Sequence, residues 1–227
     1  MMHVLLAGMA LMMHASAANA AGLDVGQKIS FHIESPAPSL PEFTLDVAEN
    51  GTAKYWEGQY PTDPAEMKRV SVLTISAPTL LKIFAAKDQI VAGECETHLK
   101  NIANTGKKKL TFAGEGKGAE CVFNYSDDEK VNAAAAAFQG IAFTLQQGVK
   151  LKHDHRFDHL GLDAHLDSLT ESVKQGWAIE LQNIAPILQS IVDDDEMMSP
   201  SRRKAKNLLD MAAVQASSQA GAAASAR

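Results

Sequence analysis

Four of the eight histidines lie between His153 and His165, and in this segment the residue types could do chemistry. If the segment is helical, His155 and His159 lie one turn apart on the same face, the spacing that zinc-binding helices use. Asp163 or His165 would supply a third ligand. Imidazole and carboxylate ligands together suit zinc, copper or nickel, so the spacing raises the hypothesis of a divalent metal site.

The same segment also fits a solvated helix end. Lys152 and Arg156 lie among the candidate ligands, so the local field is not purely anionic. Asp154 and Asp158 are four residues apart and would form ordinary surface ion pairs. The apolar members would then pack in the core: Phe157, Leu160 and Leu162. We favour this structural interpretation, because one helical turn supplies only two ligands and nothing in the sequence directs a third to them.

The remaining polar clusters point to no defined reaction. The acidic run at residues 193–196 lacks the twelve-position loop and central glycine of a calcium site, and the basic run at 202–206 can offset its charge. Ser199 and Ser201 form no recognisable catalytic arrangement with the histidines. The chain has no P-loop, no dinucleotide-binding glycine pattern, no Gly-x-Ser-x-Gly motif and no paired CxxC motif. A hydrolase with an unrecognised site is therefore only an alternative.

The two cysteines, Cys95 and Cys121, are predicted to form a disulfide. In an exported chain, two cysteines and no third favour a disulfide over a reactive thiol. Along the second strand of a predicted hairpin, Phe123 and Tyr125 share the face of Cys121, which therefore points inward. The alternative is two buried, unpaired thiols. A ring of this size would stabilise the fold by about 3.5 kcal/mol on the chain-entropy estimate.

The N-terminus has most features of a signal peptide. An apolar run from Val4 to Met13 precedes small residues and the pattern Ala18-Asn19-Ala20, which fits cleavage by signal peptidase, although no Lys or Arg precedes the run. The run is about half the ~20 residues that a membrane span needs, so no transmembrane span is expected in the mature chain. We expect residues 1–20 to be removed and the protein to be periplasmic or secreted.

The composition bounds the class of partner. The 227 residues have a formal net charge of −6, which gives no electrostatic case for a nucleic-acid partner. Hydrophobic residues make up 46% of the chain, so the body is expected to fold.

Residues 21–125 have the pattern of a β-rich region. Asn50-Gly51 is a strong hairpin signal, because a type I′ turn needs positive φ at both central residues and this pair tolerates it. The glycine-rich residues 114–118 predict a second hairpin. Ser76 is expected to cap one helix that stops near Gly93. Alternating apolar residues predict six strands, at 29–33, 43–47, 52–57, 70–75, 108–113 and 119–125.

Residues 126–211 are predicted to be a helical region packed on the sheet. Ser126 and Glu129 have the spacing of a capping box at the start of the first helix. Pro186 lies inside the third apolar stripe and either kinks that helix or starts a new turn. Residues 212–227 are rich in alanine, serine and glutamine and are predicted to be disordered. The stripes are Val131, Ala134, Phe138, Ile141 and Leu145; Leu162, Leu166, Leu169 and Val173; Leu181, Ile184, Ile187, Leu188 and Ile191; and Leu208, Leu209 and Met211.

These patterns predict an α+β fold, with an antiparallel β-sheet and one packed helix in the N-terminal half, followed by a bundle of about four α-helices. The predicted function is that of an exported, non-enzymatic binding or interaction protein. Its partner would be an unknown protein or small ligand, and no cofactor is expected. The alternatives are a metal-binding protein centred on His155 and His159, and the unrecognised hydrolase.

Overall fold

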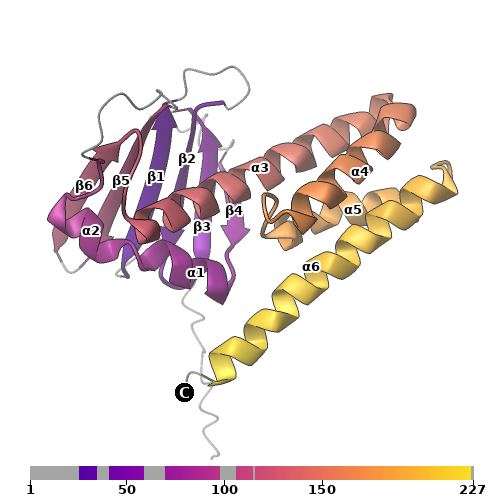
Figure 1. Cartoon of the computed structure of the whole chain (residues 1–227). Coiled ribbons are helices and arrows are strands. Elements are labelled where there is room, and N and C mark those ends of the chain that lie inside the picture. The colour runs from indigo at the N-terminus through magenta and orange to yellow at the C-terminus, as the bar shows by residue number, and fades with distance from the viewer. Residues whose placement is uncertain (1–25, 35–40, 59–69, 98–105, 115, 226–227) are drawn as a thin grey trace, which may run out of the picture.

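The structure is a computed structural model that describes residues 26–34, 41–58, 70–97, 106–114 and 116–225. The predicted signal peptide, residues 1–20, lies outside the described residues. The described part of the chain forms a six-stranded antiparallel sheet followed by a helical region, which confirms the α+β prediction (Figure 1). No helix within these ranges is long and apolar enough to cross a membrane.

The sheet has the strand order β4-β3-β2-β1-β5-β6, with every neighbouring pair antiparallel. The first four strands form a meander, and β5 then returns to pair with β1. Central β1 therefore lies between β2 and β5. The strands are β1 (Lys28–Glu34), β2 (Phe43–Ala48), β3 (Thr52–Glu57), β4 (Ser71–Thr74), β5 (Lys107–Gly114) and β6 (Lys117–Phe123).

One face of the sheet carries the first hydrophobic core. Ile29, Phe31 and Ile33 alternate along β1 and are all fully buried, as their period-two spacing predicted. Across the strands, Phe31 is paired with Leu45 on β2 and with Leu110 on β5, so the buried residues of adjacent strands lie side by side. This apolar layer is the surface on which the helices pack.

The hairpin predicted at Asn50-Gly51 is confirmed, but the type I′ turn is wrong. Of the two residues only Gly51 has a positive φ, of 86°. The Asn50 side chain instead accepts a hydrogen bond from the Thr52 N–H at 2.9 Å. Glycine is also needed at position 51 because an added Cβ would lie 2.9 Å from the Ile75 carbonyl oxygen, which leaves no room for a side chain.

The single helix predicted between Ser76 and Gly93 is two short helices, α1 (Ala77–Phe84) and α2 (Lys87–Ala92). Because of the break, the two helices pack against different elements: α1 packs on helix α3 (Glu129–Phe157), and α2 packs on β5 and β6. Gly93 ends α2 in the left-handed conformation, where the sequence places the helix stop.

Helix α3 crosses the sheet and continues beyond it into the helical region (Figure 1). Its first half presents Phe138 to the sheet, where the ring stacks on Phe31 with centroids 5.1 Å apart. Its second half carries Leu151 in a separate hydrophobic core. Leu145 lies between them and packs against both cores. One helix thus belongs to both regions.

The second core lies between the end of α3 and the remaining helices: α4 (His159–Lys174), the 3₁₀ turn η2 (Leu181–Ile184), α5 (Ala185–Asp193) and α6 (Ser199–Ser225). Leu162, Leu166 and Leu169 of α4 are buried there, as their helical spacing predicted. Pro186 lies in the first turn of α5, so it starts a new helix after η2 instead of kinking a longer one.

The disordered tail predicted from residue 212 is helical as far as Ser225. The run is rich in alanine, which has the highest helix propensity, and contains no proline that would stop the helix. Ala212 itself is buried in the second core. The helix that begins at Ser199 therefore continues past the last residue of the apolar stripe.

The start of α3 differs from the predicted capping box. The N-cap is Asp128, whose Oδ1 accepts from the backbone N–H groups of Lys130 at 2.8 Å and Val131 at 2.9 Å. Ser126 is buried, and its hydroxyl oxygen accepts from the Asp128 N–H at 3.2 Å. Aspartate is a better N-cap than serine here, because its negative charge also faces the positive end of the helix dipole.

Cys95 and Cys121 are bonded as predicted, with a Cα–Cα distance of 5.8 Å. Both side chains are buried in the sheet core. The bond links the segment that follows α2 to edge strand β6.

We expect Asp128→Ala to lower the free energy of unfolding by about 1 kcal/mol, because it removes the acceptor for two first-turn N–H groups. Asp128→Asn should keep most of that stability, since asparagine caps comparably. Urea unfolding curves of the two variants measure the difference. An unchanged stability for Asp128→Ala would contradict the assignment of the cap.

Candidate functional site

The four residues proposed as metal ligands lie in the helical region, each with different surroundings. His155 Nε2 is 2.8 Å from Asp194 Oδ2, in the loop after α5. His165 Nδ1 is 2.9 Å from Asp154 Oδ2, and its Nε2 is 2.7 Å from the Gln147 side-chain oxygen. His159 is exposed at the start of α4. The partners of the fourth residue, Asp163, are Ser201 and Lys204.

In the described ranges, no three His, Cys, Asp or Glu side chains form a group that could hold a metal ion. The metal site therefore stays a prediction to which the geometry adds no support. The expectation that Phe157 and Leu160 pack in the core is wrong, because they are 66% and 80% exposed at the turn where α3 and α4 meet. That turn lies at the end of α3 remote from the sheet (Figure 1).

His155 and His165 instead form hydrogen bonds to carboxylates on other elements, Asp194 and Asp154. Burial acts to raise the pKa of Asp154, but hydrogen bonds from His165 and His153 outweigh it and hold that pKa below its ordinary value. The pKa of Asp194 is also lowered, first by the Glu196 backbone N–H and then by His155. Because both folded-state values are depressed, the stability from these carboxylates is present above the unfolded pKa and is lost as pH falls through the folded pKa.

A buried carboxylate, that of Glu180, connects the helical region to the sheet region. Glu180 precedes η2, and its two oxygens accept from the Ser76 N–H at 3.0 Å and from the Ser76, Thr79 and Gln182 side chains. The Ser76 and Thr79 donors lie at the start of α1, so the carboxylate faces the positive end of that helix, whereas Gln182 belongs to η2. Neutral donors satisfy this carboxylate, which makes it a structural clamp and not a free general base.

The backbone at the clamp is strained and its neighbours cover a sheet edge. Glu180 has φ 61°, the only positive φ of a non-glycine residue among those described. Asn183 exchanges hydrogen bonds with the Thr74 backbone, its oxygen accepting from the N–H at 3.1 Å and its amide donating to the carbonyl at 3.1 Å. The Gln182 amide donates to the same carbonyl. Asn183 and Gln182 thus satisfy backbone groups of edge strand β4 that another strand could otherwise pair with.

A histidine and a hydroxyl meet on the sheet face opposite the first core. His32 Nδ1 lies 2.8 Å from Thr44 Oγ1, and Glu42 lies 3.5 Å from the other ring nitrogen. The order of groups is that of a base-activated nucleophile. However, the Thr44 hydroxyl donates its proton to the Gly58 carbonyl oxygen at 2.9 Å, so its oxygen accepts from the imidazole. The arrangement orients His32 but does not activate Thr44.

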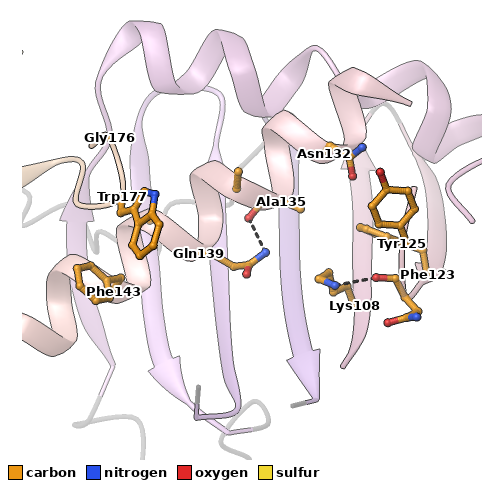
Figure 2. Close-up of a pocket in the computed structure, with 12 residues that line it drawn as sticks. Lys108, Phe123, Tyr125, Asn132, Ala135, Gln139, Phe143, Gly176 and Trp177 are labelled. Atoms are coloured by element: carbon orange, nitrogen blue, oxygen red, sulfur yellow. Dashed lines mark hydrogen bonds between the residues drawn. The ribbon is translucent and has the colours of Figure 1, made fainter. Parts of the chain in front are cut away.

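A groove runs beside the first half of α3 and encloses about 380 Å³, a volume in the range of small-molecule sites (Figure 2). Trp177 and Phe143 lie at one end, Lys108, Phe123 and Tyr125 lie at the other, and Gln139 lies between them. The floor along α3 is made of small side chains, including Ala135, Ala136 and Gly140.

The two ends of the groove differ in character. Trp177 is 67% exposed beside the apolar floor, although a tryptophan ordinarily buries much of its large surface. At the other end, Lys108 Nζ donates to the Asn124 carbonyl at 2.7 Å and lies 6.0 Å from the Phe123 ring centroid. Burial lowers the pKa of Lys108, against the opposing charge of Glu96. The groove therefore combines an exposed aromatic surface with a partly desolvated cation.

Gly140 explains how the aromatic end is built. An added Cβ at this position would lie 3.1 Å from both the Trp177 carbonyl oxygen and the Ile179 side chain. The glycine thus lets the connection after α4 approach α3 closely. Gly176, in the left-handed conformation with φ 77°, ends the preceding helix and turns the chain toward the groove.

Sequence reasoning missed both the clamp and the groove. Glu180 reads as an ordinary surface residue, and no local pattern shows that it is buried. The groove combines residues from β5, β6, α3 and the connection after α4, which lie far apart in the chain. One local signal was present, since Trp177 directly follows a helix-ending glycine and belongs to no apolar stripe.

No family model matches the chain, and searches of curated proteins and of solved structures found no significant match.

We expect Glu180→Ala to lower the free energy of unfolding by about 3 kcal/mol, because buried donors on Ser76 and Thr79 lose their acceptor. Glu180→Gly should be less harmful by about 1 kcal/mol, since glycine adopts the positive φ without strain. Urea unfolding measures both, with exposed Glu171→Ala as the control. If Glu180→Ala stays within about 0.5 kcal/mol of the wild type, the clamp does not hold the two regions together.

Proposed function

We propose that the protein is an exported, non-enzymatic binding protein and that the groove beside α3 is its binding site. The observation that carries the proposal is the exposed Trp177 indole at the end of a groove with a small-residue floor. Exposed aromatic surface next to a concavity is where ligands gain most from leaving water. The ligand would cover the indole and lie along α3.

Binding without catalysis fits the polar groups that border the groove. Its described lining contains no histidine, aspartate, glutamate, serine or cysteine, so Lys108 and Tyr125 are the only described lining residues that belong to the common acids, bases and nucleophiles. The His32 and Thr44 pair lies on the opposite sheet face, and its hydroxyl proton is donated to a backbone carbonyl. The groove can bind and orient a molecule, and its amide and ammonium donors supply the polar contacts.

Export is the proposed location for two reasons. The Cys95–Cys121 bond would persist in an oxidising compartment, whereas cytosolic reductants keep most thiols reduced. The first 20 residues have the apolar run and the small-residue cleavage pattern of a signal peptide. A periplasmic or secreted binding protein is consistent with both.

Fluorine NMR of protein labelled with 5-fluorotryptophan tests the binding site directly, because the chain has two tryptophans in different surroundings. Trp56 is buried in β3, and Trp177 is exposed in the groove. In a screen of a small-molecule fragment library, groove ligands should shift the Trp177 resonance and leave Trp56 unchanged.

A matched pair of variants separates the groove from the rest of α3. Ala136 and Ala133 are both exposed on this helix, but only Ala136 lines the groove. Ala136→Phe should abolish the fragment-induced shifts, whereas Ala133→Phe should retain them. The proposal fails if no fragment shifts Trp177, or if the shifts survive in Ala136→Phe.

A further inference from the structure

We infer that the groove takes a small amphipathic carboxylate, with its anionic head at Lys108 and its apolar body along α3 toward Trp177. This inference rests on the proposed function and adds the chemical class of the ligand. It follows from how charge, polarity and apolar surface are distributed along the groove.

The charge of the lining has one sign. Of the lining residues that the structure describes, Lys108 alone carries a formal charge at neutral pH, and the rest are amides, aromatics and small residues. This is unusual for a chain whose net charge is −6. A ligand carboxylate in the groove therefore meets a cation, and none of the described lining residues is itself a carboxylate.

Lys108 is held so that its ammonium group stays at the groove. Its neighbour in the chain, Lys109, points to the other sheet face and pairs with Glu120 at 2.7 Å. Lys108 instead donates to the Asn124 carbonyl and lies near the Phe123 ring. The nearby Glu96 carboxylate accepts from the Asn124 N–H at 2.8 Å, so one of its oxygens is bound to the backbone.

Burial makes this cation a better partner for an anion than a surface lysine is. Desolvation is the main reason that the Lys108 pKa is lowered, and it outweighs the opposing effect of Glu96. A carboxylate that arrives with the ligand would favour the charged form and recover part of the lost solvation. An exposed lysine has no such penalty to recover.

The remainder of the groove is lined mainly by small and aromatic residues, which favours an apolar portion of the ligand. Between the two ends the floor is formed by Ala135, Ala136 and Gly140, which leave no bulky side chain in the path. Phe143 and the exposed Trp177 form the far end (Figure 2). A hydrocarbon chain or ring placed there removes apolar surface from water on both the protein and the ligand.

Three probes with one tail and different heads test the assignment: decanoate, decanol and decyltrimethylammonium, each below its micelle-forming concentration. Binding is followed by the Trp177 fluorine resonance of the full-length protein, and an unchanged Trp56 resonance confirms that each variant is folded. Decanoate should bind about tenfold more tightly than decanol, the effect of a charge-assisted contact, and the ammonium probe more weakly than either.

The variants Lys108→Gln and Lys109→Gln form the matched pair, because the two lysines are neighbours on opposite faces of β5. Lys108→Gln should remove the preference for decanoate over decanol. Lys109→Gln should behave as the wild type.

Equal binding of decanoate and decanol would overturn the anionic assignment while leaving the groove as a binding site. Failure of all three probes, with fragments still shifting Trp177, would likewise overturn the ligand class alone. A decanoate preference that survives in Lys108→Gln would place the head elsewhere and overturn the inference. Failure of both the probes and the fragment screen would reject the proposed function itself.

Discussion

Helix α3 packs against two hydrophobic cores at once, and the rest of the structure depends on this double contact. Phe138 stacks on Phe31 in the sheet core, and Leu151 is buried in the helical core 13 residues further along, about 20 Å at the rise of an α-helix. The Glu180 carboxylate adds a second tie, from the helical region to the start of α1. The groove follows from the same arrangement, because α3 forms its floor and the connection after α4 forms its aromatic end.

Much of the fold could be predicted from the sequence because its elements have regular periods. The buried alternation of β1 and the leucine stripe of α4 are local patterns that packing then satisfies. Errors arose where tertiary contacts decide. The helix break after Phe84 depends on which neighbours α1 and α2 reach, and the cap at Asp128 replaced Ser126, which is buried under the helix start.

The candidate sites were harder to predict, for a different physical reason. The histidine segment attracted attention because its spacing is local, yet His155 and His165 bind carboxylates on separate elements. The groove has no local spacing at all, since strand pairing brings Lys108 near Phe123 and a glycine on α3 admits the Trp177 backbone. A sequence shows which side chains could do chemistry, but only the packing shows which of them face the same space.

The claim that α3 unites both regions is tested most directly by unfolding the protein in urea while both tryptophans are observed separately. Trp56 reports on the sheet, and Trp177 reports on the connection between α4 and η2. Leu151→Ala, which lies wholly in the helical core, should cost about 2–5 kcal/mol. The account predicts that the two resonances keep a common midpoint and that this variant lowers both equally. Loss of the Trp177 signal well before that of Trp56 would show two independently stable regions and contradict it.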